Sequence, residues 1–223
     1  MSESNGKFCV IGLGKFGFNV ASNLYQNGNE VIAIDLNKDK VQKIADECTV
    51  PIVGDASDKQ FLLSHGVSEV DAVFVSAGDN SDMTTLITLL LREIGVKRIF
   101  AKTNSEEHKR ILGKVGATDI IFPEKDIAVK LAVSLSYKNI SEYIPLSKDF
   151  SISEIIVHPN IIGKNLMELD LRKKFHINIV AIKNPEKDKF SITVDPNYRI
   201  KKDDILIVVG KNVDIATFSS INY

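Results

Sequence analysis

The chain has 223 residues, which is enough for one large domain or for an ordinary domain followed by a small one. Its 29 acidic and 28 basic residues nearly cancel, which excludes a strong overall field for nucleic acid or an anionic membrane. The two cysteines, Cys9 and Cys48, form no CxxC pair, so we expect a reduced, intracellular protein without a disulfide framework or zinc site.

Short β-branched runs alternate with longer amphipathic stretches over roughly the first 140 residues, as expected of repeated βαβ units. Strands are predicted at residues 8–13, 30–35, 51–55, 71–77, 98–102 and 119–123. Helices are predicted at residues 19–26, 38–47, 59–64, 81–93, 105–114 and 124–136. This order predicts an α/β fold, with a doubly wound parallel Rossmann sheet in a domain of residues 1–140.

The texture of the chain changes after this region, because apolar residues then alternate with period two. The alternating segments lie at residues 141–146, 151–158, 177–183, 190–194 and 204–210. Turn signals separate them at Pro145, Pro159, Asn184-Pro185 and Pro196-Asn197. We therefore expect a second, smaller α+β domain over residues 141–223.

A GxGxxG motif, Gly12-Leu13-Gly14-Lys15-Phe16-Gly17, follows the first predicted strand at once and opens a helical stretch. In such a loop the first glycine permits the tight turn, the second lets backbone approach a diphosphate, and the third lets helix and strand pack. Asp35 closes the second strand, where a carboxylate would bind ribose hydroxyls and repel a 2′-phosphate, so NADP is disfavoured. The alternative is a tight turn without any ligand.

Two further side chains belong to this loop. Lys15 could reach a terminal phosphate as a point charge, or it could simply be solvated. We count Phe16 among the cofactor-binding candidates because it lies in the same loop.

More candidates follow the carboxyl ends of the other strands, where open α/β sheets bind ligands. They are Gly54, Asp55, Ala56, Ala77, Gly78, Asp79, Asn80, Lys102 and Glu124. Asp55 could bind an adenine amino group or cap a helix. Glu124 could bind a cation or a phosphate-linked metal, or it could stabilise the first turn of its helix.

Catalytic groups beside such a site are hard to find. Tyr198 and Lys202 have a Tyr-x-x-x-Lys spacing, but they lie beyond the Rossmann half and would not share a helix face. The histidines look structural or solvated, since none has a carboxylate at relay spacing. We expect a helix C-terminus at His65, an exposed helix at His108, a turn at His158 and a strand start at His176. A nucleotide site without chemical groups indicates a sensor and not an enzyme.

The segments FCVIGLGKFG, VIAID, GDAS, TLLLREIG and GATDIIFPEKD occur in this order, with the small domain behind them. Together they resemble the RCK (KTN) family of potassium-transport regulators, and its KtrA-like members in particular, over nearly the whole chain. The resemblance implies a Rossmann (RCK_N) domain that binds ATP or ADP, followed by an RCK_C domain. It also implies a homodimer that assembles into an octameric ring beneath a KtrB-like membrane potassium-translocating subunit.

The same resemblance implies roles for single residues. Lys15 stands where the family usually has an arginine that meets the terminal phosphate. Glu124, in the FPEK segment, corresponds to a glutamate that helps bind a divalent or monovalent cation, or phosphate, near the subunit interface. The second domain resembles a cyclic di-AMP receptor whose pocket spans a dimer, and ordinary dimer packing is the alternative. The matching candidates are Ile162, Asp170, Arg172, Asn178 and Pro196, and His176 replaces an expected glycine.

A role at a membrane would require a partner. The polar segment MSESNGK precedes no apolar signal segment, and the stretch around residues 86–91 is far shorter than the ~20 apolar residues of a spanning helix. We therefore expect a cytoplasmic protein, peripheral to the membrane through its partner, that gates potassium transport. An NAD(H)-dependent oxidoreductase and an NAD(H) redox sensor stay open, because Asp35 suits ATP, ADP and NAD alike. No basic recognition helix for nucleic acid is evident.

Overall fold

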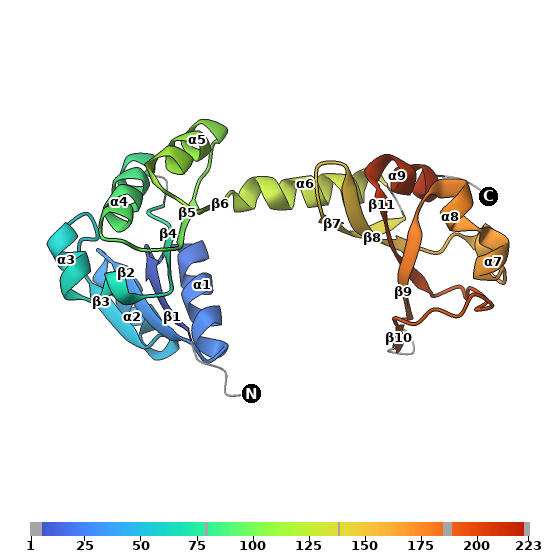
Figure 1. Cartoon of the computed structure of the whole chain (residues 1–223). Coiled ribbons are helices and arrows are strands. Elements are labelled where there is room, and N and C mark those ends of the chain that lie inside the picture. The colour runs from blue at the N-terminus through green and yellow to red at the C-terminus, as the bar shows by residue number, and fades with distance from the viewer. Residues whose placement is uncertain (1–5, 79, 138, 185–188, 221–223) are drawn as a thin grey trace. The chain divides into compact units, whose positions relative to one another are not determined.

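The computed structural model describes residues 6–78, 80–137, 139–184 and 189–220. The chain divides into two compact units, Met1–Glu124 and Lys125–Tyr223, each with a sheet of its own (Figure 1). Asp79 and Pro185, which the sequence offered as a site candidate and a turn residue, lie outside the described residues.

The N-terminal unit is built on a six-stranded parallel sheet of order β3-β2-β1-β4-β5-β6, as the sequence predicts for a Rossmann fold. Its strands are β1 (Lys7–Ile11), β2 (Glu30–Asp35), β3 (Val50–Val53), β4 (Ala72–Val75), β5 (Ile99–Lys102) and β6 (Asp119–Ile121). Its helices are α1 (Lys15–Gln26), α2 (Lys38–Ile44), α3 (Lys59–Ser64), α4 (Ser81–Glu93) and α5 (Glu106–Val115), with short 3₁₀ turns at Ala45–Glu47 and Val67–Glu69. Strands β1 to β3 extend the sheet in one direction, and β4 to β6 extend it in the opposite direction from β1. This switch in strand order places a crevice beyond the carboxyl ends of β1 and β4.

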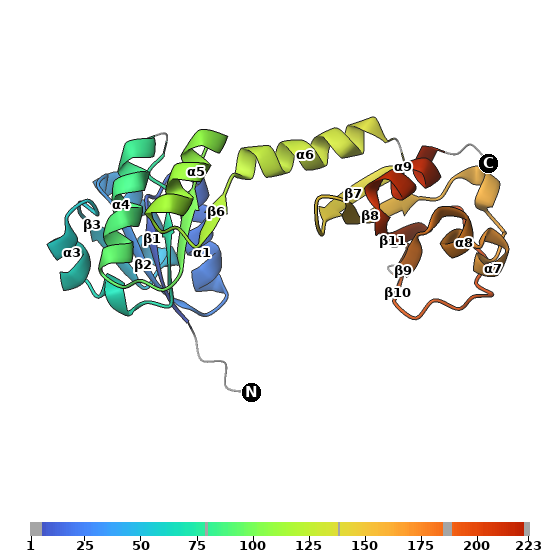
Figure 2. The same cartoon turned by 45° about the horizontal axis from the view of Figure 1, so that its top comes forward.

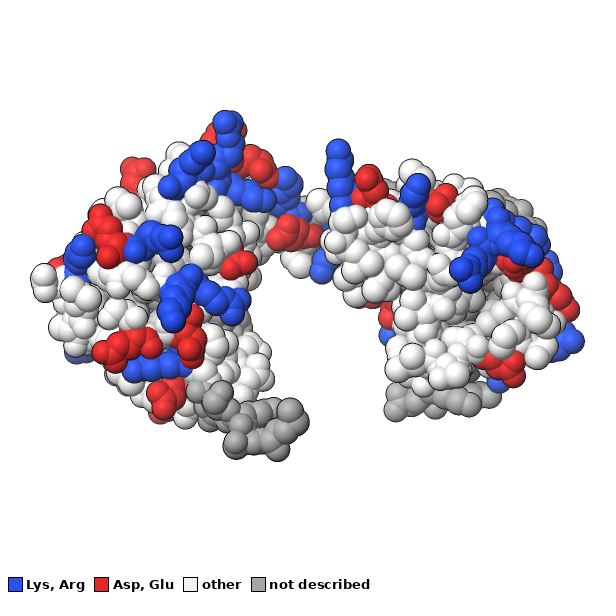
Figure 3. All heavy atoms as spheres, viewed as in Figure 1, with Lys and Arg blue, Asp and Glu red and all other residues white. Residues whose placement is uncertain are grey.

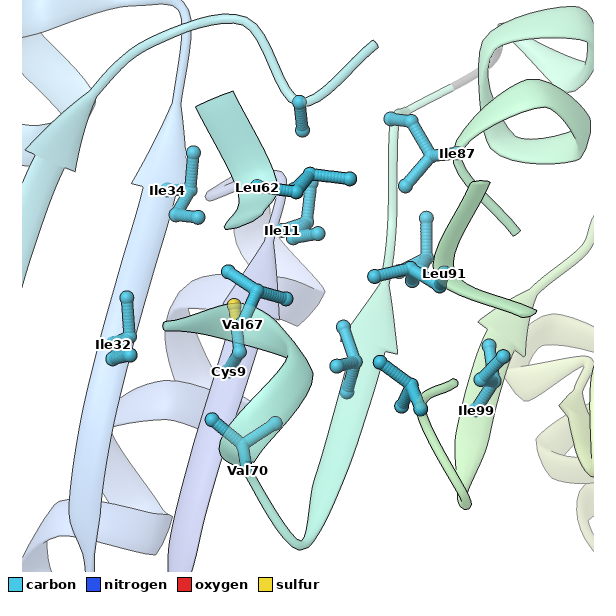
Figure 4. Packing of buried hydrophobic residues seen from close by; sticks show 14 residues of the cluster. Cys9, Ile11, Ile32, Ile34, Leu62, Val67, Val70, Ile87, Leu91 and Ile99 are labelled. Atoms are coloured by element: carbon cyan, nitrogen blue, oxygen red, sulfur yellow. The ribbon is translucent and has the colours of Figure 1, made fainter. Parts of the chain in front are cut away.

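Helices cover both faces of this sheet (Figure 2). On one face α1 and α2 pack against Val10, Val31 and Ala33. On the other face, α3 and α4 pack against Cys9, Ile11 and neighbouring strand residues (Figure 4). Strands that are apolar on both sides are the expected core of a parallel sheet, so the polar groups of this unit collect at its strand ends.

Side chains at the loop ends fix where the helices begin. Asn37, Asp58, Asn80 and Ser105 each accept backbone N–H groups at the first turn of α2, α3, α4 and α5. Helix α1 is the exception, since its N-cap is Gly14, which has no side chain to accept a hydrogen bond. Helix α1 begins at Lys15 and not at the predicted residue 19, so the glycine-rich loop is shorter than the periodicity suggested.

The C-terminal unit has an antiparallel sheet of order β10-β9-β11-β8-β7, in agreement with the predicted smaller α+β domain. Its strands are β7 (Ile140–Pro145), β8 (Phe150–Ile156), β9 (Asn178–Asn184), β10 (Lys189–Ser191) and β11 (Ile205–Lys211). Its helices are α6 (Pro123–Ser136, which starts in the N-terminal unit), α7 (Leu166–Leu169), α8 (Leu171–Phe175) and α9 (Asn212–Ser220), with a 3₁₀ turn at Pro159–Ile161. The alternation revealed the strands but not α7, α8 and α9.

Two expectations for this unit were wrong. The segment 190–194 was predicted to be a full strand, but β10 ends at Ser191 and Ile192 is 71% exposed. His176 does not begin a strand: it ends α8 with φ of +55°, and β9 starts two residues later. The left-handed backbone at His176 is the conformation that favours the glycine expected there.

Helix α6 lies between the two sheets in the chain and carries exposed apolar side chains. Ile127, Leu131 and Leu135 are 62%, 57% and 75% exposed. The predicted domain boundary after residue 140 falls at the start of β7. The division of the sequence into two compact units falls earlier, after Glu124. In the part of the chain that the structure describes, no helix combines the length and apolar character needed to cross a bilayer.

Candidate functional site

A cavity of about 380 Å³ opens at the switch point of the parallel sheet, beyond the carboxyl ends of β1, β2 and β4. Its size falls within the range of small-molecule sites. It is lined by Ile11, Gly12, Gly14, Ile34, Asp35, Leu36, Asn37, Lys40, Gly54, Asp55, Ala56, Ser76, Ala77, Gly78, Asn80, Met83 and Ile87. Most of the residues predicted from the glycine-rich loop and the strand ends therefore surround one space.

The three glycines of the loop have different geometric roles. Gly12 has φ of +90°, and a Cβ there would lie 2.0 Å from the carbonyl oxygen of Ser76. A Cβ on Gly17 would lie 1.9 Å from the carbonyl oxygen of Gly12, so this glycine lets α1 pack closely on β1. Gly14 has no heavy atom within 4 Å of its Cβ position, which leaves open space for a ligand. The first-turn amides of α1 face that space without a capping side chain or an acidic residue.

Asp35 ends β2 and lines the same cavity, and its side chain is only 9% exposed. Its Oδ2 accepts from the Leu13 amide at 2.7 Å and from Lys40 Nζ at 3.2 Å, while Oδ1 accepts from the Asn37 amide at 2.8 Å. The carboxylate is thus held at the cavity edge by two backbone donors and one cation. Sequence reasoning did not find Asn37 and Lys40, although their positions two and five residues after Asp35 place them at the start of the next helix.

Asp55 lines the same cavity from the end of β3. Its Oδ1 accepts from the Ser57 hydroxyl at 2.7 Å and the Ser57 amide at 2.8 Å, and these bonds lower the pKa of the carboxyl below its ordinary value. The capping role considered for Asp55 belongs to Asp58, which begins α3. Asp55 therefore orders the loop between β3 and α3 through its Oδ1 and also lines the cavity.

The segment between β4 and α4 forms another wall of the cavity. Ser76, Ala77 and Gly78 line it, with Gly78 in the left-handed region at φ of +67°. Asn80 also lines the cavity, and its side chain accepts from the Met83 amide at 2.9 Å as the cap of α4. Ser76 and Met83 were not among the sequence candidates.

Some predicted residues lie away from this cavity. Phe16 packs its ring 5.7 Å from that of Phe74, beside an apolar groove of about 270 Å³ on the α1 side of the sheet. Lys15 is exposed at the first position of α1. Gly17 is buried in the packing of α1, where its function is structural.

Lys102 and Glu124 pair with each other. Lys102 Nζ donates to Glu124 Oε1 at 2.8 Å, and this hydrogen bond lowers the pKa of Glu124. The ammonium also lies 6.0 Å from the centre of the Phe16 ring. In residues 6–78, 80–137, 139–184 and 189–220 no group of three or more His, Cys, Asp or Glu side chains is arranged to hold a metal ion.

The histidines make structural contacts, and the burial of His108 differs from the prediction. His65 ends α3 and His158 begins a 3₁₀ turn, as expected. His108 was predicted on an exposed helix face but is only 6% exposed, because it packs between α4 and β5 and bonds to Thr85 and Thr103.

Tyr198 lies in the C-terminal unit and donates a hydrogen bond to Asp204. Burial, and to a lesser extent this hydrogen bond, raises the pKa of Tyr198 to about 12.

The candidates of the second unit lie on its surface. Ile162, Arg172, Asn178 and Pro196 are exposed and Asp170 is half-buried. Arg172 belongs to a basic run on α8 with Lys173 and Lys174, and basic side chains cluster over α8 in Figure 3. Two cavities of this unit, of about 160 and 120 Å³, are lined by other side chains.

These features define a class: a protein with a Rossmann fold, a glycine-rich loop at the switch point of its sheet, and a small antiparallel domain that follows in the sequence. The family model of the TrkA-N domain matches residues 8–123, and that of the TrkA-C domain matches residues 152–222. Ktr system potassium uptake protein C of Bacillus subtilis (strain 168) is 37% identical over 214 residues, 95% of this chain and 95% of that protein. Ktr system potassium uptake protein A of the same organism is 37% identical over 216 residues, 97% of this chain and 96% of that protein.

A solved structure shares the fold. The GsuK channel bound to NAD superposes with a TM-score of 0.57 at 24% identity, over 98% of this chain and 38% of that one. This chain therefore spans less than half the length of that channel chain. The chain belongs to the RCK-type family of Ktr potassium uptake proteins, in which a TrkA-N domain precedes a TrkA-C domain.

Proposed function

We propose that this chain is a cytoplasmic regulatory subunit, not an enzyme, that binds ATP or ADP in the cavity of its N-terminal unit. Binding would gate a KtrB-like membrane subunit that conducts potassium. The observation that carries the proposal is the cavity itself, which places the uncapped start of α1 opposite the Asp35 carboxylate. A diphosphate suits the first feature and a ribose the second.

Lys15 gives the site a means to distinguish ATP from ADP. It follows Gly14, is exposed, and is free to extend over the end of a bound polyphosphate. A third phosphate reached by Lys15 in only one conformation of the assembly would shift the equilibrium toward that conformation. Because lysine is a point charge and not a bidentate fork, we expect this discrimination to be modest.

Calorimetric titration of the purified chain with ATP, ADP and NADH tests the site. We expect Lys15→Ala to weaken ATP about tenfold and ADP less. Lys43→Ala, an exposed lysine at the last turn of α2, is the matched control and should change neither. A chain that binds none of the three nucleotides would overturn the proposal. Preference for NADH, the nucleotide class of the GsuK channel bound to NAD, would favour a redox sensor instead.

A homodimer is the smallest assembly that would cover helix α6. Its exposed Ile127, Leu131 and Leu135 are unfavourable in water, and the apolar groove beside Phe16 offers a complementary surface on a second copy. Leu86, Leu89 and Ile111 form a second exposed apolar set on α4 and α5, which could join dimers into an octameric ring. Leu131→Glu should dissociate dimers in light-scattering measurements, whereas Lys130→Glu on the same helix should not.

Two further ligands belong to the proposal. A cation near Glu124 would need oxygen atoms from phosphate or from a second copy, since Lys102 already binds Oε1 of this carboxylate. Cyclic di-AMP would bind between two C-terminal units, with the basic run on α8 facing its phosphates. Titration with cyclic di-AMP of wild type and Arg172→Ala checks the second ligand. Potassium flux through vesicles that hold the membrane subunit, with and without ATP, checks the gating.

A further inference from the structure

Lys40 occupies the part of the cavity where a ribose would bind. It lies in the first turn of α2, lines the cavity, and places its ammonium 3.2 Å from Asp35 Oδ2. The lysine side chain is 44% exposed, whereas that of Asp35 is 9% exposed. The lysine of this pair is therefore more accessible to solvent than the carboxylate.

The hydrogen bonds of Asp35 leave little capacity for a ribose diol. A carboxylate has about four acceptor positions. Among the described residues, the Leu13 amide and Lys40 Nζ use two on Oδ2, and the Asn37 amide uses one on Oδ1. The two backbone donors are fixed by the glycine-rich loop and by the start of α2, so only Lys40 is mobile. A diol that donates both hydroxyls to Asp35 must displace Lys40.

The charge balance of the subsite also differs from that of an isolated carboxylate. An unpaired Asp35 would repel a phosphate on the ribose, which is why the sequence alone disfavours NADP. Paired with Lys40, the carboxylate is compensated, and an ammonium with three donors gives only one of them to Asp35. Because the Lys40 side chain lines the cavity and is 44% exposed, its other donors can reach a phosphate on a ribose hydroxyl.

We propose that Lys40 makes the ribose subsite accept adenine nucleotides that carry a phosphate on the 2′ or 3′ ribose hydroxyl. This inference rests on the proposed nucleotide site. Lys40 determines specificity by keeping the Asp35 charge neutralised and by binding the added phosphate. Free-diol nucleotides bind as well, by displacing the same lysine toward solvent.

Calorimetry compares three probes on the full chain: AMP, adenosine 2′,5′-bisphosphate and adenosine 3′,5′-bisphosphate. The measured quantity is the Kd of each bisphosphate divided by the Kd of AMP. For wild type, we expect a ratio below about ten for at least one bisphosphate. Lys40→Met should raise that ratio at least tenfold. Lys40→Arg should keep it low, and Asp35→Asn should lower it.

Lys38→Met is the matched control, because Lys38 begins the same helix but does not line the cavity. This variant should leave the ratio within about twofold of wild type. The proposal is overturned if wild type binds AMP but both ratios exceed ten, or if Lys40→Met raises the low ratio less than tenfold. A wild-type chain that binds neither AMP nor ADP refutes the nucleotide site itself, and the role of Lys40 with it.

Discussion

The two units of this chain present their candidate ligand residues in opposite ways. In the N-terminal unit, Gly12, Gly14 and Asp35 surround one cavity, although helix α1 and most of strand β2 separate the aspartate from the glycines in the sequence. In the C-terminal unit, Arg172 and Asn178 are exposed on separate elements. A site formed inside one chain is fixed by backbone geometry that the chain itself supplies. The cyclic di-AMP site proposed for the C-terminal unit would need a second copy, and its candidate residues do not converge within the single chain.

The largest expected effect on stability comes from adding a methyl group to Gly12, and the same change at Gly14 provides the contrast. In Gly12→Ala the new Cβ would lie 2.0 Å from the Ser76 oxygen at a φ of +90°, so we expect the free energy of unfolding to fall by about 3 kcal/mol or more. In Gly14→Ala the Cβ enters open space, so stability should hold within about 0.5 kcal/mol while nucleotide affinity falls. Urea unfolding followed by circular dichroism, together with calorimetry, separates the two results.

Equal stability losses in both variants would mean that the cavity is not preformed around Gly14. That result would remove the main contrast between the two units.

The C-terminal unit contains a buried polar network around Asp204, and its candidate ligand residues are not part of this network. Asp204 is fully buried and accepts from Asn184 Nδ2, Tyr198 OH and the Lys201 amide, each at 2.8 Å. Asp204→Ala leaves these donors without their acceptor, so the free energy of unfolding should fall by about 3 kcal/mol. Asp203→Ala, at the half-buried neighbour, should cost less than about 1 kcal/mol in the same urea titration.

A small effect of Asp204→Ala would show that water replaces the carboxylate, and that this loop is as adaptable as the exposed candidates.

For the N-terminal unit, the sequence predicted the fold better than the positions of single side chains, and the reasons are physical. The parallel sheet and the place of the candidate site at its strand ends followed from the alternation of apolar runs and from the GxGxxG spacing, because both reflect local backbone geometry. Lys40 was missed because its role depends on a side-chain pairing across the start of α2. Phe16 was misplaced because the helix begins at Lys15 and turns the ring toward Phe74. Helices α7 and α8 are too short for helical periodicity to reveal.

His176 provides a smaller test, in which the C-terminal unit should gain stability. It holds φ of +55° after α8, a conformation that costs a non-glycine residue about 1 kcal/mol. His176→Gly should therefore raise the free energy of unfolding by about 0.5 to 1 kcal/mol. Lys174→Gly, inside α8, should lower it by about 1 kcal/mol. A loss of stability in His176→Gly would mean that the imidazole makes contacts that outweigh the backbone cost.

The smallest expected effect is a pH dependence of the N-terminal unit. His108 bonds through its two ring nitrogens to Thr85 Oγ1 and Thr103 Oγ1, each at 3.1 Å, and burial lowers its pKa. The Ser81 backbone and the charge of Asp82 oppose this lowering of the pKa but do not cancel it. Because the folded pKa lies below the unfolded value, the unfolded chain binds more protons, and stability falls as pH falls below about 6.5.

Urea titrations of wild type between pH 7.5 and 5 should therefore show a decrease in unfolding free energy that His108→Gln lacks. His65→Gln, at the exposed end of α3, serves as the control and should follow wild type. Only the slope with pH is compared, since His108→Gln also changes packing between α4 and α5. If His108→Gln keeps the wild-type slope, the decrease belongs to other groups, and His108 holds these helices together without sensing protons.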